Sequence, residues 1–543
     1  MHRYLVLLAV LVLIVLCLRI LKARTIGHLG ESRNRPRMIR WRIRLRMRPG
    51  PGFASATELT VRWSRLRCVI SGKRSRPSLP LWARLVSPAT MYGVRLGRAQ
   101  WGRRTFGRME DQTLVIAPPR SGKSGALADR IMDHPGPCVV TTTRADLYDL
   151  TAAHRAALGP IEWFNPLGIG GLGSSVRWDV VTGCEDPMTA IRRAQALTGA
   201  VPDGDLAEWI KLAGSALAAL LHAAAIGGRT ILDVYGWANR YLEGEPEEIL
   251  ATIPGASAEL LKTLATIQGD SRTAGSIRTT MTKSIDWVAV PALAEAVTPE
   301  PGTGFEIRSW VNRSGTLYLI APDAAENSPV GPLFRALAEE IHYVAGLAGS
   351  CGPHGRLDPP LLFALDEVCQ VCPVPLPSWM ADSAGKGILI VAVAHGIGQL
   401  EARYGKPGAA AIWETSGVKL LLGGIDDDEL LSAVSRVCGQ VDVRRKRGDD
   451  TFVSVPVVPP EVLRTLADFR ALVLRTNLSP CVVKLRMAWK RRDFRKAPRP
   501  AFQHTPVFPP APALPGRAPE PAPFSTLTGA GNGHSNGNGH AHG

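Results

Sequence analysis

Residues 113–127 read TLVIAPPRSGKSGAL and combine residue types that bind the phosphates of a nucleotide. An apolar stretch leads into a short loop, and a helix-forming stretch follows it. In such a P-loop, backbone N–H groups surround the phosphates, a lysine contacts the outer oxygens and a hydroxyl binds Mg²⁺. Lys123 and Ser124 fit the last two roles, and Ala117 stands where the loop usually begins with glycine. The predicted phosphate-binding residues are Ala117, Pro118, Pro119, Arg120, Ser121, Gly122, Lys123, Ser124 and Gly125.

A second stretch, LLFALDE at 361–367, ends in two carboxylates. Its apolar residues predict a strand buried on both faces, as in a parallel sheet covered by helices. Neighbouring side chains at a strand end diverge, so Asp366 can hold Mg²⁺ while Glu367 orients and deprotonates the attacking water. The alternative is a strand that ends in a solvated acidic turn. Because the P-loop is also present, we favour an ATPase with ATP and Mg²⁺ as cofactors.

Charge is distributed unevenly along the 543 residues. Through Arg108 there are 24 Lys and Arg against Glu31 and Glu58, a net charge of +22. Since the whole chain carries +17, the remainder carries 17 − 22 = −5. The basic pI therefore belongs to the N-terminal region, which weakens any inference of nucleic-acid binding from the overall charge.

Residues 4–18 form an unbroken apolar run that is followed by a dense series of arginines. This pattern predicts a membrane anchor, although a signal peptide has an apolar region of similar length. No small-x-small cleavage site follows the run, and export would separate the P-loop from ATP. We therefore expect a single-pass anchor in the cell membrane with a cytoplasmic body.

Arginine alternates with apolar residues from Ile39 to Arg48. A strand with this period has one cationic and one apolar face, which suits anionic lipid or a phosphate backbone. Lipid is the favoured partner because the segment lies about twenty residues beyond the anchor. The alternating residues are Arg40, Arg42, Arg44, Arg46 and Arg48 with Ile39, Trp41, Ile43, Leu45 and Met47.

Apolar residues recur at helical spacing between about 186 and 297, whereas strand-like runs occur at 317–321, 388–395, 418–424 and 471–476. Repeated β-α units around a P-loop predict an α/β fold with a parallel-rich, RecA-like sheet. We expect five parts: a membrane anchor at 1–24, a basic membrane-proximal region at 25–96, a P-loop ATPase domain at 97–185 and 300–485, an inserted all-α domain at 186–299, and a basic, then Pro/Gly-rich disordered tail at 486–543.

The order of motifs resembles the TraG-type coupling proteins of type IV secretion, especially their actinobacterial conjugation branch. The motifs are APPRSGKS, TTTRADLYDLTAAHR, EWFNP, LDE, AHGIGQLEARYG and AIWETSGVKLLLGG, within about residues 97–485. The resemblance implies a hexameric, membrane-anchored motor that moves relaxase-bound DNA into a secretion channel. Its implied partners are DNA, relaxase or relaxosome proteins, channel components, the membrane and further copies of the chain.

The same resemblance assigns phosphate and Mg²⁺ contact to Lys123 and Ser124, and metal and water activation to Asp366 and Glu367. It also implies a sensor after the 388–393 strand, where related proteins usually carry glutamine. His395 stands there, and its imidazole can donate to phosphate with a charge that varies near neutral pH. Gln399 matches the second polar position of that motif.

Two further features depart from the family pattern or leave alternatives open. Many related proteins have two spans, whereas one is visible here. Ring motors also place an arginine against a neighbour's γ-phosphate. Arg403, Arg436 and Arg464 are candidates, but the sequence does not choose among them, and an ordinary surface role is favoured for each.

The nine cysteines follow no disulfide framework and indicate a reducing compartment, and the close pair Cys369 and Cys372 lacks the further ligands of a zinc site. Near the C-terminus, basic residues interleave with aromatic ones, which suits either single-strand contact or a solvated basic end. These residues are Lys484, Arg486, Trp489, Lys490, Arg491, Arg492, Phe494, Arg495, Lys496 and Arg499.

Three functions follow from the sequence and the resemblance. The favoured one is an ATPase that translocates DNA into a conjugation channel. The second is a related motor whose cargo is protein, against which DNA-stimulated turnover would count. The third is a non-catalytic docking or assembly factor that uses ATP as a switch, an alternative raised by His395.

Overall fold

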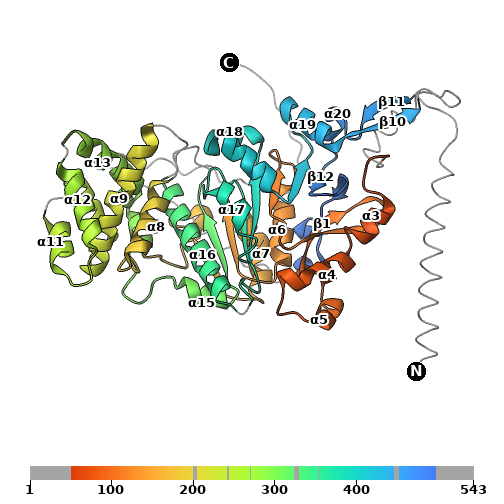
Figure 1. The fold of residues 1–543 in the computed structure, drawn as a ribbon. Helices are drawn as coiled ribbons and strands as arrows, with labels where there is room; N and C mark the ends of the chain where they lie inside the picture. The colour runs from red at the N-terminus through yellow and green to blue at the C-terminus, as the bar shows by residue number, and fades with distance from the viewer. Residues whose placement is uncertain are drawn as a thin grey trace, which may run out of the picture. The chain divides into compact units, whose positions relative to one another are not determined.

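A large mixed β-sheet forms the centre of the part of the chain that the computed structural model describes (Figure 1). This part comprises residues 50–199, 205–240, 244–269, 271–322, 329–352, 354–444 and 452–496. The predicted anchor, the arginine alternation and the Pro/Gly-rich tail lie outside it.

The sheet has a parallel centre and an antiparallel extension. Its strands are β1 (Gly93–Arg98), β2 (Arg104–Arg108), β3 (Thr113–Ile116), β4 (Cys138–Thr142), β5 (Ile161–Phe164), β6 (Thr316–Ile320), β7 (Leu361–Leu365), β8 (Ile388–Ala394), β9 (Val418–Leu422), β12 (Arg470–Arg475) and β13 (Cys481–Lys484). Within the described residues the order is β2-β1-β13-β12-β9-β3-β8-β7-β4-β6-β5. All neighbours from β9 to β5 are parallel, and the other four strands join antiparallel. The predicted α/β class with a parallel-rich sheet is confirmed.

The central strands are buried on both faces. Every residue of β3, β7 and β8 is buried, as their continuous apolar sequences predict. On one face, Val115 packs with Leu127 and Ile131 of α6 (Lys123–Asp133) and with α7 (Asp146–Arg155). On the other face, Leu114 packs in the core that includes α16 (Gly331–Cys351), α17 (Leu376–Asp382) and α18 (Ile397–Thr415). The sheet is therefore covered by helices on both sides.

Every described element between residues 187 and 297 is helical, and these helices gather in one group (Figure 1). They are α8 (Pro187–Thr198), α9 (Asp205–Ile226), α10 (Ile231–Asn239), α11 (Glu245–Thr252), α12 (Ala258–Gly269), α13 (Ser271–Ile285), the 3₁₀ turn η4 (Asp286–Ala289) and α14 (Pro291–Val297). The predicted apolar face of α9 is largely buried, for example at Leu217 and Leu221. Within the described residues, α9 is also the helix long and apolar enough to span a membrane, but it packs against α8, α12 and α13 as a core helix. The domain boundaries remain a prediction.

Buried arginines join this helical group to the sheet domain. Arg335 of α16 donates from Nη2 to the carbonyl of Leu197, near the end of α8, at 2.8 Å. Arg193 of α8 pairs with Glu340 of α16 at 3.4 Å, and both side chains are almost fully buried. These charge-assisted contacts connect the two helices where the chain passes from one part to the other.

Outside the central layers, the chain adds several short elements. These are α3 (Ala56–Val61), α4 (Arg65–Ser75), α5 (Leu81–Val86), η1 (Ala89–Met91), η2 (Gln100–Gly102), η3 (Ile169–Gly171), α15 (Ile307–Asn312), α19 (Asp428–Cys438), α20 (Pro460–Arg464), η5 (Ala488–Lys490), α21 (Arg492–Lys496) and the hairpin of β10 (Gln440–Arg444) and β11 (Phe452–Pro456). The part of the predicted basic region that is described, from residue 50, is therefore mostly helical.

Residues 486–496, which the sequence assigned to the basic start of the tail, pack against the P-loop helix α6 and against α7. Arg486 pairs with Asp129 and Asp133 of α6 at 2.6 Å each. Arg491 pairs with the same two carboxylates at 3.0 and 2.7 Å. We call these four residues the clamp. Both arginines of the clamp are therefore paired with carboxylates of the same chain.

The clamp should contribute measurably to stability. Arg491→Met would leave two largely buried aspartates with only Arg486 as a partner, and burial already raises the pKa of Asp129. We expect the free energy of unfolding to fall by about 3 kcal/mol, because removing one partner leaves a buried charge incompletely paired. The midpoint of thermal unfolding checks this, with exposed Arg492→Met as the matched control. Equal midpoints for the two variants would contradict a stabilising clamp.

Candidate functional site

Three segments that the sequence analysis singled out meet at the carboxyl edge of the sheet. The P-loop follows β3, Asp366 and Glu367 follow β7, and His395 follows β8. Since β8 lies between β3 and β7 and all three are parallel, their carboxyl ends are neighbours. Ligand sites in open α/β sheets form at this edge.

The P-loop presents unpaired backbone donors at the start of α6. The N–H of Ala117 still donates to the carbonyl of Ala394 at 3.0 Å, which ties the loop to β8. The chain then turns through Arg120 and Gly122, both with positive φ. Gly122 is the N-cap of α6 and provides no side-chain cap. The first N–H groups of the helix, including those of Lys123 and Ser124, are therefore available to an anion.

Lys123 faces both predicted carboxylates. Its Nζ lies 2.5 Å from Oε1 of Glu367 and 3.5 Å from Oδ1 of Asp366. All three side chains are largely buried. One cation thus stands against two carboxylates, an arrangement that leaves net negative charge in a poorly solvated place.

The excess of negative charge affects the pKa of Asp366. Its pKa is raised to about 6 overall, because burial raises it more than the charge of Lys123 lowers it and the charge of Glu367 adds to the rise. Oδ1 of Asp366 is buried and lies beyond good hydrogen-bonding geometry from any partner in the described residues. A buried carboxylate oxygen without a hydrogen bond, beside a second carboxylate and close to a hydroxyl-bearing P-loop, suits a hard divalent cation. The residues therefore fit Mg²⁺.

His395 joins this cluster, and Gln399 does not. Nε2 of His395 lies 3.6 Å from Oε1 of Glu367, and Nδ1 lies 3.2 Å from the carbonyl oxygen of Ala117. The imidazole therefore bridges the carboxylate and the P-loop. The side chain of Gln399 instead accepts from the backbone N–H of His395 at 3.0 Å, at the start of α18. This bond connects the residue after β8 with the start of α18, and a role for Gln399 in the site stays a prediction.

The arginine candidates lie on the surface of the chain. Arg403 and Arg436 are exposed, and Arg464 pairs with exposed Asp426 at 2.7 Å. None of these contacts joins the cluster of Lys123 and the two carboxylates. A role toward a neighbouring subunit stays a prediction for each.

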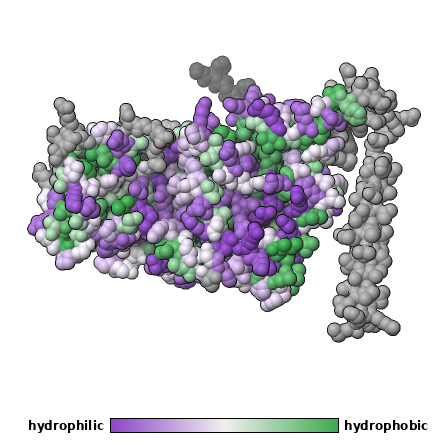
Figure 2. Space-filling model, viewed as in Figure 1, coloured by the Kyte–Doolittle hydropathy of each residue, from purple (hydrophilic) through white to green (hydrophobic). Residues whose placement is uncertain are grey.

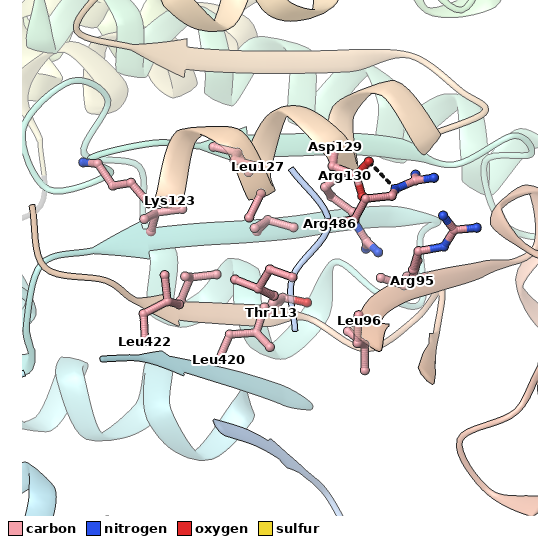
Figure 3. A pocket seen from close by; sticks show the side chains of 17 residues that line it. Arg95, Leu96, Thr113, Lys123, Leu127, Asp129, Arg130, Leu420, Leu422 and Arg486 are labelled. Atoms are coloured by element: carbon pink, nitrogen blue, oxygen red, sulfur yellow. Dashed lines mark ion pairs between the residues drawn. The ribbon is translucent and has the colours of Figure 1, made fainter. Parts of the chain in front are cut away.

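A cavity of about 60 Å³ lies between α6 and the sheet, next to the loop but distinct from it (Figure 3). Lys123 lies at one end, and Arg486, paired with Asp129, lies at the other. Most of the wall between them is apolar, including Leu127 and Leu420. Because apolar walls do not solvate a triphosphate, we read this cavity as a packing gap under the P-loop helix.

Three residues near the site were not predicted to serve it. Asp146, at the start of α7, adds negative charge that raises the pKa of Asp366. Phe469 and Trp489 lie against Gly122 and Gly125 of the loop. The sequence placed Asp146 in a family motif and Trp489 in a basic cluster, but nothing in it indicated proximity to the P-loop.

Comparisons with known proteins show which family and which fold the chain resembles. Residues 360–466 match the family model described as the TraM recognition site of TraD and TraG. A probable conjugal transfer protein TraG from Sinorhizobium fredii is 29% identical over 151 residues. That alignment covers 25% of this chain and 23% of the relative, so the chain matches about a quarter of the relative's length.

Solved structures of the plasmid coupling protein TrwB share the fold. The complex with a non-hydrolysable GTP analogue has a TM-score of 0.52 at 20% identity, covering 69% of this chain and 86% of TrwB. The complex with ADP and Mg²⁺ has the same score and identity, covering 70% and 85%. The complex with a non-hydrolysable ATP analogue scores 0.53 at 20% identity and covers 77% and 92%. At this identity the likeness establishes the fold.

The resemblance predicted from the sequence is confirmed, while its actinobacterial branch stays a prediction. The family model matches residues 360–466, the curated relative aligns with 25% of the chain, and the TrwB fold covers 77% of it. The chain is similar to the TraG/TraD-type coupling proteins.

Proposed function

We propose that this chain is a P-loop ATPase that couples ATP hydrolysis to the movement of DNA into a type IV conjugation channel. The observation that carries the ATPase proposal is the contact of Lys123 with both Asp366 and Glu367 beside the free N-terminus of α6. ATP would bind with its phosphates on residues 117–125. Mg²⁺, held by Ser124 and Asp366, would neutralise phosphate charge and polarise the phosphoryl group.

The contacts suggest how the residues would act in sequence. Lys123 would leave Glu367 for the β and γ oxygens of ATP, since phosphates offer it more negative charge. Glu367, released from the lysine, would accept a proton from the water that attacks the γ-phosphorus as the bond to ADP breaks. His395 would donate a hydrogen bond to the phosphate or to Glu367, which links the state of the nucleotide to β8 and α18.

The DNA cargo is supported by the relatives. The curated relative is named as a conjugal transfer protein, TrwB as a plasmid coupling protein, and the matching family model as a TraM recognition site. By analogy, residues 360–466 would contact relaxosome proteins, and a homo-hexamer would surround the DNA next to secretion channel components. A protein cargo remains the second candidate, because the same P-loop chemistry can drive either one.

Turnover in the presence of DNA tests the proposal. We expect the chain to hydrolyse ATP faster when single- or double-stranded DNA is added, and the more effective form identifies the substrate. Lys123→Ala should abolish turnover, since the γ-phosphate loses its cation. Turnover that DNA leaves unchanged would favour a protein cargo, and ATP binding without any turnover would favour the switch.

His395 provides a sharper test within the site. His395→Gln should keep turnover within about threefold of the wild type, because an amide can donate to the same oxygen. His395→Ala should lower kcat by about a hundredfold, the typical cost of losing one donor to a reacting group. Steady-state kinetics at saturating ATP measure both. Equal rates for the wild type and the alanine variant would show that His395 does not contribute to turnover.

A membrane location is supported by the surface of α3, α4 and α5. Large apolar side chains are exposed on each of these helices, and Trp82 and Val86 of α5 reach 69% and 76% exposure. Figure 2 shows the apolar patch over α5. Exposed Arg62, Arg65 and Arg67 lie nearby in the chain. Apolar and basic side chains together suit an anionic lipid surface, so we propose that this side faces the membrane in which residues 1–24 would be anchored.

Quenching by brominated lipids tests this orientation in proteoliposomes of the full chain. If Trp82 meets the bilayer, brominated acyl chains quench it, and Trp82→Phe reduces the quenched fraction of the fluorescence. Trp101→Phe is the control, because Trp101 is similarly exposed at 66% but lies outside α3 to α5. Equal quenched fractions in the wild type and the Trp82 variant would contradict a membrane-facing α5.

A further inference from the structure

We infer that Trp489, supported by Phe469, is the platform on which the base of the nucleotide stacks. This inference rests on the proposed function and deepens it, because it names the residue that recognises the nucleoside end of the ligand. The class of ligand is a nucleoside triphosphate whose base presents a flat π face.

Two aromatic side chains lie directly against the glycines of the P-loop. A Cβ placed on Gly125 would come within 2.3 Å of the Trp489 ring, and one on Gly122 within 2.7 Å of the Phe469 ring. The two rings are perpendicular, with centroids 6.4 Å apart. Glycine at these positions therefore allows the aromatic pair to approach the loop backbone.

Trp489 keeps accessible surface although it packs against the loop. It is 39% exposed, and its six-membered ring is the part that touches Gly125. Phe469 is partly buried beneath it, and Lys490 places Nζ 5.1 Å from the centre of the Phe469 ring. An indole ring that packs against the loop at one edge and keeps solvent-accessible surface is a suitable stacking partner for a base.

The position of this pair matches the expected direction of the bound nucleotide. Glu367 and Asp366 mark the γ-phosphate end, because Lys123 contacts them. In a P-loop the helix N-terminus holds the inner phosphates, so the nucleoside leaves the loop away from that carboxylate pair. Gly125 lies one step farther into α6 than Ser124, on the side where Trp489 packs.

The clamp holds the platform in place. Trp489 lies in η5, between Arg486 and Arg491, and both arginines bind Asp129 and Asp133 of α6. The tryptophan is therefore attached to the same helix whose N-terminus holds the phosphates. This arrangement gives the C-terminal basic and aromatic residues a role other than the DNA contact considered from the sequence.

Binding of ATP and of inorganic triphosphate, each with Mg²⁺, separates the base from the phosphates. Isothermal titration of the full chain in detergent measures both dissociation constants for the wild type, Trp489→Ala and Trp489→Phe. We expect Trp489→Ala to weaken ATP at least about tenfold, the typical effect of losing one stacked base, and to leave triphosphate unchanged. Trp489→Phe should stay within about threefold of the wild type for both ligands. Trp101→Ala is the matched exposed control.

The outcomes distinguish this inference from the proposed function. If Trp489→Ala weakens ATP and triphosphate equally, the tryptophan supports the loop and does not bind the base, so the inference fails. The inference also fails if Trp489→Ala binds ATP as tightly as the wild type does. If Lys123→Ala loses both ligands in the same experiment, the proposed phosphate site is supported even though the inference has failed. A wild-type chain that binds neither ligand would contradict the nucleotide site and the platform together.

Discussion

The excess of negative charge at the carboxyl edge of the sheet is the constraint on which the site depends. Asp366 and Glu367 face the single ammonium of Lys123 in a place with little solvent. Burial and mutual repulsion raise the pKa of Asp366 to about 6. A magnesium ion and a set of phosphates together would supply the missing cation and a new partner for the lysine. Under the proposed function, the ion pair of Lys123 with Glu367 would therefore be exchanged for one with the phosphates.

The residues that would take part in this exchange are positioned by the contacts of α6. The helix is packed on the buried strand β3, its first residue Lys123 reaches β7, and its far end is held by the clamp. If Lys123 moved, Glu367 would lose its ion pair. Glu367 in turn lies beside His395, which contacts α18 through Gln399. The helical group α8–α14 is joined to α16 on the other face of the sheet. Helices that contact one another thus cover both faces of the sheet around the loop.

The fold and the central residues were predictable because they depend on local patterns. Continuous apolar runs identified β3, β7 and β8, and the glycine and lysine of the loop identified the start of α6. Contacts between distant segments were not predictable in the same way. The clamp joins residues 129–133 to residues 486–491, and a basic cluster read alone gives no sign that buried aspartates neutralise it. For the same reason the positions of Trp489 and Phe469 were not predicted: they pack against Gly122 and Gly125, and a glycine, which has no side chain, gives no sequence pattern that indicates such a contact.

The most direct test of this account is a structure of the chain with Mg²⁺ and a non-hydrolysable ATP analogue. The account predicts that Nζ of Lys123 leaves Glu367 and lies within hydrogen-bonding distance of the β and γ oxygens, with Asp366 turned toward the metal. A structure in which Lys123 remains paired with Glu367 while the nucleotide binds elsewhere would contradict it.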